Sequence, residues 1–202
     1  MSKIVFAAVL GAFVSALLVR ADAQLRKAPE LAFTVPSEGD KLLSQYRGKV
    51  VALEFILTTC PHCQAASRLM SNFQREYGSR GFQALDVAID ALDGRSPAQA
   101  AQVVQVFANQ FQVAFPVGFT TRDQMMTFMG FNLADRFVVP QLVLIDRKGM
   151  IHYQTPATEN DQHDNDMKDN VIKQRIEELL ALPAAATATH TTKSRATTKK
   201  ST

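Results

Sequence analysis

The sequence predicts an α/β domain in which helices cover a mixed β-sheet. Two observations support this prediction. Apolar runs of strand length alternate with segments whose apolar residues recur at helical spacing. Two further strand-like runs then follow each other across residues 146–149, a glycine-containing sequence typical of a hairpin turn. Alternating strands and helices favour parallel pairing, and the hairpin adds antiparallel strands, so the sheet is expected to be mixed.

The first half of the domain contains two expected strands and one helix. Residues 31–35 form a short strand candidate. Residues 50–57 are a nearly continuous apolar run, typical of a buried parallel strand, with Glu54 as the exception. A helix is expected from Pro61, which suits the first helical position because an N–H would have no partner there. Its apolar residues recur at helical spacing until Gly78, which is expected to end the helix.

The second half continues the alternation of strands and helices. Two of its expected helices open with a capping box, in which Ser or Thr is followed three residues later by Gln. The expected elements are strands 82–89 and 113–117, helices that begin after Ser96 and Thr121, hairpin strands 141–145 and 150–154, and a last amphipathic helix that stops before Pro183.

The N-terminus has the pattern of an export segment. Lys3 precedes an apolar run over residues 4–19, and a small-x-small pattern precedes Gln24. The run is shorter than the roughly 20 residues that a membrane-spanning helix needs. We therefore expect residues 1–23 to be a cleaved signal peptide, with an uncleaved membrane anchor as the alternative because Arg20 directly follows the run. Both alternatives place the domain outside the cytoplasm, where disulfide chemistry is common.

Composition limits the remaining possibilities. Apolar residues make up 47% of the 202-residue chain, so one domain can bury a sizeable core without a disulfide. The net charge of +3 is too small to argue for nucleic-acid binding. We expect the domain to span residues 28–182 and the basic, Ala/Thr/Lys-rich residues 184–202 to be a disordered tail.

The chain has only two cysteines, Cys60 and Cys63, separated by Pro61 and His62. Thiols three residues apart at the start of a helix can form a disulfide with each other. The first sulfur faces the positive end of the helix, which favours its thiolate. The alternatives are a structural disulfide or half of a zinc site, but a zinc site needs about four ligands and the chain has no second cysteine pair. Redox chemistry is the favoured interpretation.

The strand before Cys60, the Cys60-Pro61-His62-Cys63 motif at a helix start, and Pro140 at the head of a hairpin resemble the thioredoxin superfamily. The resemblance covers about residues 28–182 and is best to the exported TlpA/ResA-like branch of redoxin (AhpC/TSA-type) proteins. It implies a thioredoxin-like three-layer sandwich, with residues 96–117 as a mid-domain helix–strand insertion. It also implies a thiol–disulfide oxidoreductase. One departure is Thr59, at the place where the family usually has tryptophan.

The resemblance also implies roles for individual residues. Cys60 is the nucleophile and Cys63 resolves the mixed disulfide. Pro140 is the cis-proline that faces the cysteines, and Val139 before it helps to tune the redox potential. Glu54, six residues before Cys60, is a buried acid with a raised pKa that accepts the proton of Cys63. The alternatives for Glu54 are a place at a polar edge or an ion pair with a lysine.

The residues between the cysteines bear on the direction of electron flow. A positive His62 would stabilise the Cys60 thiolate, and one pKa unit corresponds to about 30 mV for this couple. The Pro61-His62 pair and Val139 therefore favour an oxidant, whereas the TlpA/ResA-like body favours reduction of partner proteins. We favour reduction or exchange on protein thiols and disulfides, with a membrane or periplasmic partner that recycles the pair. No cofactor and no metal are expected.

Two other functions fit the sequence less well. A peroxiredoxin-like antioxidant peroxidase resembles Pro-x-x-x-Thr-x-x-Cys at its active site, but Leu53 and Leu57 occupy the proline and threonine places here. Copper-delivery proteins of similar fold have cysteines four apart, whereas the spacing here is three. The acidic residues 158–166, which include His163, are expected to be a solvated loop rather than a metal site.

Overall fold

The computed structural model describes residues 25–134 and 136–183. The expected signal or anchor segment, residues 1–23, and the expected tail, residues 184–202, lie outside these ranges. No helix within the described ranges is long and apolar enough to cross a lipid bilayer.

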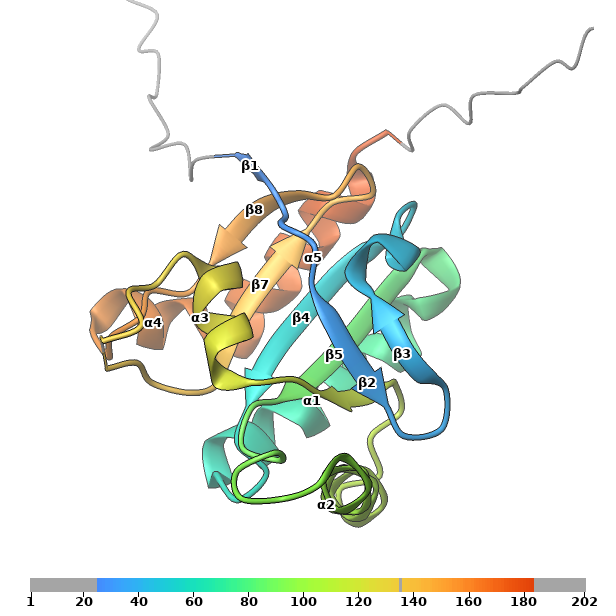
Figure 1. The fold of residues 1–202 in the computed structure, drawn as a ribbon. Helices are drawn as coiled ribbons and strands as arrows, with labels where there is room; N and C mark the ends of the chain where they lie inside the picture. Colours follow the sequence, from blue (N-terminus) through green and yellow to red (C-terminus); the bar gives the residue numbers. More distant parts are fainter. Residues whose placement is uncertain (1–24, 135, 184–202) are drawn as a thin grey trace, which may run out of the picture.

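The described strands form one mixed sheet in the order β1-β8-β7-β4-β5-β6-β2-β3 (Figure 1). The central strands β4, β5 and β6 are parallel, and all other neighbours are antiparallel. The strands are β1 (Arg26–Lys27), β2 (Ala32–Val35), β3 (Gly39–Leu42), β4 (Val50–Ile56), β5 (Phe82–Ala88), β6 (Val117–Phe119), β7 (Gln141–Ile145) and β8 (Met150–Gln154). The mixed sheet is as the sequence predicts.

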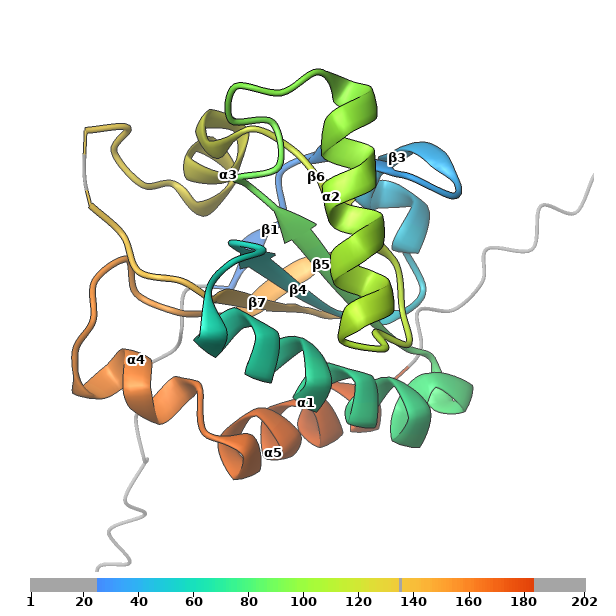
Figure 2. The ribbon, with the colours of Figure 1, turned by 90° about the horizontal axis from the view of Figure 1, so that it is seen from below.

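Helices cover both faces of the sheet and complete a three-layer architecture. They are α1 (Pro61–Tyr77), α2 (Pro97–Gln110), α3 (Arg122–Met129), α4 (Asp161–Asp166) and α5 (Asp169–Ala181). Helices α1 and α5 lie side by side on one face (Figure 2), and α2 packs over β6. Helix α3 packs on the opposite face. The predicted α/β sandwich is therefore confirmed.

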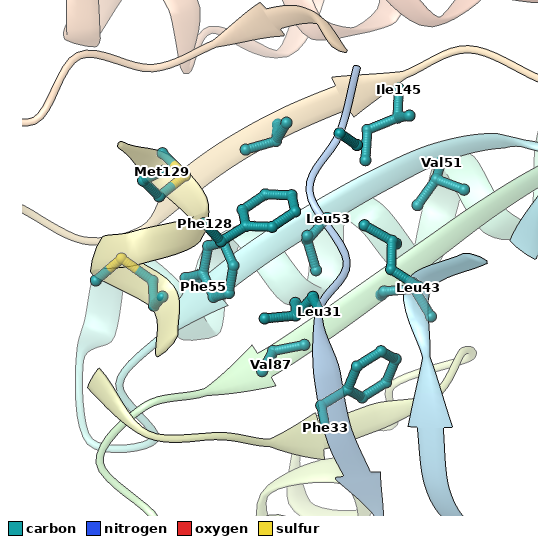
Figure 3. Close-up of a cluster of buried hydrophobic side chains, with 14 of the residues drawn as sticks. Leu31, Phe33, Leu43, Val51, Leu53, Phe55, Val87, Phe128, Met129 and Ile145 are labelled. Atoms are coloured by element: carbon teal, nitrogen blue, oxygen red, sulfur yellow. The ribbon is translucent and has the colours of Figure 1, made fainter. Parts of the chain in front are cut away.

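The alternation of side chains along β4 decides which residues meet which layer. Leu53 and Phe55 point into the cluster on the α3 face, where Phe128 and Leu31 also pack (Figure 3). Residues at even positions point to the opposite face, under α1 and α5. Glu54 therefore lies in the layer beneath α1, completely buried.

Several of the predicted helix caps and turn residues are present in the structure. The side chains of Ser96 and Thr121 accept hydrogen bonds from the third residue of their helices, so both capping boxes are confirmed. Gly149 closes the hairpin turn with a φ of 80°. Helix α1 ends at Tyr77, but Gly78 itself is right-handed and a short 3₁₀ turn follows. The left-handed residue that redirects the chain is Gly81, with a φ of 88°.

The strand expected at residues 113–117 is wrong in its position, because β6 starts only at Val117. Pro116 has no N–H to donate to a sheet, so pairing by donation begins after it. Gly118 then allows β6 to pass close to β2. A Cβ atom at Gly118 would lie 2.8 Å from Phe33 Cδ2 and 2.9 Å from the Thr34 carbonyl oxygen.

Candidate active site

Cys60 caps the N-terminus of α1. Its backbone is extended (φ −81°, ψ 121°), and its carbonyl oxygen accepts a hydrogen bond from the Gln64 N–H at 3.0 Å. Pro61 occupies the first helical position, as predicted. The Cys60 side chain is half-buried and its thiol is free. The thiol therefore lies at the positive end of a 17-residue helix, a place that stabilises a thiolate.

The half-buried carboxylate of Asp90 fixes the turn that carries Cys60. Asp90, two residues after the end of β5, accepts hydrogen bonds from the Thr58 N–H at 3.0 and 3.1 Å and from its hydroxyl at 2.8 Å. The Gln64 side-chain amide donates to the Thr58 carbonyl at 3.2 Å. Sequence reasoning did not identify Asp90. The available signal was an acid directly after a buried strand, at the sheet end where functional loops gather.

Cys63 differs sharply from Cys60 in its surroundings. Its side chain is 0% exposed and packs in a cluster with Ile56 and Ala88. Burial raises the pKa of the Cys63 thiol well above its ordinary value, and the neighbouring Cys60 raises it further. The motif thus holds one thiol that a partner can reach and one protonated thiol beneath it.

Two carboxyl groups lie side by side under α1. Glu54 of β4 and Asp86 of β5 are paired in register, and both side chains are 0% exposed. Ser67 Oγ donates to Asp86 Oδ2 at 2.6 Å. Both carboxylate oxygens of Glu54 and Asp86 Oδ1 have no hydrogen-bond partner among the described residues. Glu54 therefore does not lie at a polar edge or pair with a lysine.

The environment of this pair favours protonation. Burial, and next the charge of Asp86, raise the pKa of Glu54 well above its ordinary value. Burial also raises the pKa of Asp86 to about 7, although the Ser67 hydrogen bond opposes the shift. The predicted burial and raised pKa of Glu54 are present in the structure, whereas sequence reasoning missed Asp86.

Pro140 lies at the head of β7 and follows a cis peptide bond from Val139. The next residue, Gln141, pairs with Phe55 near the end of β4, so Pro140 and the cysteine turn share one end of the sheet. Val139 packs against the cluster that contains Cys63. Among the described residues, the backbone N–H and C=O of Val139 have no hydrogen-bond partner. A backbone edge beside the redox motif is therefore open.

A groove of about 730 Å³ runs along this side of the motif. Pro61 and His62 line it together with apolar residues of α1 and of the loop before β7. Three exposed carboxylates line it from the segment around α4, and we name them the acidic wall: Glu159, Asp164 and Asp169. The groove thus combines apolar surface with negative charge next to Cys60.

The segment expected to be a solvated loop at residues 158–166 is wrong in part, because it contains helix α4. Asn160 caps this helix by accepting a hydrogen bond from the His163 N–H at 2.9 Å. His163 is buried, and its Nε2 lies 3.3 Å from the Pro140 carbonyl oxygen. Since a carbonyl oxygen only accepts, Nε2 is the donor. This contact joins α4 to the Pro140 loop.

No metal site accompanies the redox motif in the described part of the chain. Residues 25–134 and 136–183 contain no group of three or more His, Cys, Asp or Glu side chains placed to hold an ion. His62 is exposed on α1, between the two cysteines, and faces the groove.

The sequence and fold were compared with known proteins. A family model described as the AhpC/TSA family matches residues 25–154. Thioredoxin-like protein YneN of Bacillus subtilis is 27% identical over 128 residues, covering 62% of this chain and 67% of that protein. Thiol-disulfide oxidoreductase ResA of Geobacillus kaustophilus is 27% identical over 124 residues, covering 61% and 64%. The matched region thus spans about two thirds of each curated relative.

Solved structures agree with the predicted fold. A putative thiol:disulfide interchange protein DsbE from Chlorobium tepidum superposes with a TM-score of 0.60 at 26% identity, covering 77% of this chain and 96% of that chain. A putative protein disulfide isomerase from Bacteroides thetaiotaomicron gives 0.58 at 24% identity, covering 77% and 88%. The thioredoxin-like fold and the resemblance to the TlpA/ResA-like branch are confirmed. The names agree with the predicted enzyme class, a thiol–disulfide oxidoreductase.

Proposed function

Because the chain belongs to the AhpC/TSA family, we propose that it is an extracytoplasmic thiol–disulfide oxidoreductase that acts on partner proteins through Cys60 and Cys63. One observation carries the proposal. Cys60 is half-buried at the N-terminus of α1, whereas Cys63 is completely buried one turn further on. An accessible thiol at a helix N-terminus and a buried thiol one turn further on suit an attacking and a resolving cysteine.

The reaction has two steps. The Cys60 thiolate attacks a substrate disulfide, forms a mixed disulfide with one substrate sulfur and expels the other as a thiolate. Cys63 then loses its proton and attacks Cys60 Sγ, which releases the second substrate thiolate and leaves a Cys60–Cys63 disulfide. The substrate is reduced and the protein is oxidised. A membrane or periplasmic redox partner then reduces the pair again.

The substrate segment binds along the groove beside Pro61 and Pro140. The unpaired N–H and C=O groups of Val139 support this placement, because an extended peptide can add to an open backbone edge. Main-chain pairing there would hold a substrate cysteine without demanding a particular side chain. Charge in the groove comes from the acidic wall, which favours basic residues next to that cysteine.

Two features favour opposite directions of electron flow. His62 is exposed beside Cys60, and a positive imidazole there stabilises the thiolate and makes the disulfide more oxidising. The resemblance to the TlpA/ResA-like branch instead favours reduction of partner proteins, which is the direction we propose. The equilibrium of the Cys60–Cys63 pair with glutathione buffers measures the potential directly. A strongly oxidising value would overturn the proposed direction.

Trapping experiments test the assigned roles. Cys63→Ser should accumulate a stable mixed disulfide with a disulfide-bonded substrate protein, and Cys60→Ser should accumulate none. If Cys63→Ser consumes hydrogen peroxide catalytically and Cys60→Ser does not, the protein is a peroxidase and the proposal is wrong. Export is tested by mass spectrometry of the protein from cells: an extracytoplasmic fraction supports it, and a cytoplasmic one contradicts it.

A further inference from the structure

The two-step reaction removes a proton from Cys63, a proton that the family resemblance assigns to Glu54, but it gives no role to Asp86. Asp86 is as deeply buried as Glu54 and faces it across the β4–β5 register. No lysine or arginine among the described residues forms an ion pair with either group. A carboxylate in an apolar layer without a cation is costly, so its presence next to the redox motif requires an explanation.

Two adjacent buried carboxyl groups do not both ionise at neutral pH, because each charge opposes the other in a medium without water. They titrate as a unit and share one proton over a range of pH. Hydrogen bonding indicates where that proton lies. Ser67 Oγ donates to Asp86, whereas Glu54 receives no donor. The negative charge is therefore better placed on Asp86 and the proton on Glu54.

The pair lies directly beneath the resolving cysteine. Cys63 and Ser67 are one turn apart on α1, and the Ser67 hydroxyl lies 3.0 Å from the Cys63 carbonyl oxygen. The charge of Glu54 contributes to the raised pKa of the Cys63 thiol, and the charge of Asp86 contributes to the raised pKa of Glu54. Cys60 is a second titratable group that acts on the Cys63 thiol. Asp86 therefore influences Cys63 through Glu54.

We propose that Glu54 and Asp86 form a proton-sharing carboxylate pair that holds one proton in the reduced enzyme and takes a second from Cys63 during resolution. Cys63 Sγ gives its proton to Glu54, and the proton already on Glu54 passes to Asp86. The bond between Cys63 Sγ and Cys60 Sγ forms, and the bond between Cys60 Sγ and the substrate breaks. The released substrate thiolate takes a proton from water, and the extra proton leaves the pair for solvent.

Asp86 is a positioning residue in this scheme, since it keeps a base available at Glu54. A protonated Glu54 can take a further proton only if it passes its own to a neighbouring carboxylate, and Asp86 is that neighbour. With Asp86 beside it, the pair keeps one negative charge among the apolar residues. The inference rests on the proposed function, because it concerns the resolution step.

The test uses the full chain and an aromatic disulfide, dithionitrobenzoate, in single turnover. Attack by Cys60 releases one coloured thiolate, and resolution by Cys63 releases a second in a later phase. We expect Asp86→Asn to slow the second phase at neutral pH by about tenfold or more and to change its pH profile, with the first phase unchanged. Glu54→Gln should do the same, and the double variant should be no slower than either single variant. Asp146→Asn, a buried acid in the hairpin turn, is the matched control.

The outcomes separate the two proposals. Release of only one thiolate by the wild type would contradict the proposed function itself. Two releases, with a second phase that Asp86→Asn leaves unchanged, would contradict only the carboxylate pair. Infrared spectroscopy provides a readout that needs no variant to fold. The reduced wild type should show a buried, protonated carboxylic acid at neutral pH, and its absence would overturn the pair.

Discussion

Two groups of carboxylates lie close to the cysteines and differ in their access to water. Glu54 and Asp86 are fully buried between α1 and the sheet. The acidic wall, Glu159, Asp164 and Asp169, is exposed along the groove. The same functional group therefore serves two purposes within one site. Without water a carboxyl group takes up a proton near neutral pH, and in water it remains a fixed charge.

The buried pair should make the protein less stable as pH rises, and this is the largest effect we expect. The pKa of Asp86 rises in the folded state from 3.8 to about 7, and that of Glu54 also rises. At pH values between the pKa of these groups in the unfolded chain and their pKa in the folded protein, the folded protein holds protons that the unfolded chain has released. The free energy of unfolding should therefore fall by up to about 1.4 kcal/mol per pH unit for each retained proton. Urea denaturation from about pH 5 to about pH 7 measures the slope.

A double variant serves as the control for this slope. Glu54→Gln combined with Asp86→Asn removes both titrations and should flatten the dependence. Asp146, whose pKa is lowered, titrates below this window and does not disturb it. A wild-type stability that is constant or rises across the window would contradict the comparison, because the buried acids would then be ionised like the exposed ones.

Replacing one carboxyl group of the buried pair and one of the acidic wall should show how differently the two groups contribute to the free energy of unfolding. Glu54→Leu removes a buried carboxyl group without a hydrogen-bond donor, so the free energy of unfolding should rise by about 1–3 kcal/mol at neutral pH. Glu159→Leu changes an exposed position and should stay within about 0.5 kcal/mol of the wild type. Denaturant titration of both variants measures the difference. A loss of stability in Glu54→Leu would contradict this, because it would mean that the Glu54 carboxyl group stabilises the folded protein.

The features of this site that could be predicted from the sequence are those that depend on residues close together in the chain. The cysteine spacing, Pro61 at the helix start and the capping boxes are each specified by a few adjacent residues, and all are present in the structure. The groove could not be predicted in the same way. Helix α4 reads as a solvated loop because its residues are polar, and the place of His163 depends on contact with Pro140 across 23 residues.

The buried pair shows where prediction from sequence ends. Glu54 is conspicuous within an apolar strand, and Asp86 is equally conspicuous within the next one. Neither residue by itself indicates that the parallel register places the two side by side. That contact depends on strand pairing, which joins residues far apart in the chain. A second acid in the neighbouring buried strand was the signal available.

The acidic wall should select substrates by charge. Peptide disulfides with arginine beside the cysteine should react with Cys60 about five- to tenfold faster than peptides with glutamate there, at low ionic strength. Neutralising Glu159, Asp164 and Asp169 together should remove most of this preference. The rate of the first thiolate release with each peptide measures it.

A charge-matched variant controls for the change in net charge. Glu38→Gln, Asp40→Asn and Asp123→Asn alter the same number of exposed acids, none of which lines the groove. This variant should retain the preference for basic peptides. If both triple variants lose it equally, the selection comes from the overall charge of the protein and the groove has no special part.

The smallest effect we expect is that of salt, which should weaken the action of the exposed carboxylates but not that of the buried pair. Mobile ions screen charges in water over a Debye length of about 10 Å at 0.1 M, but they do not enter the layer beneath α1. Raising the salt concentration from about 0.05 M to about 0.5 M should therefore abolish most of the preference for basic peptides in the first phase. The second phase, in which Cys63 passes its proton to the Glu54–Asp86 pair, should change by less than about twofold. Stopped-flow measurement of both phases in one mixing experiment tests this directly. A resolution step as sensitive to salt as the attack step would mean that its charges are solvated, and the distinction between buried and exposed acids would not hold.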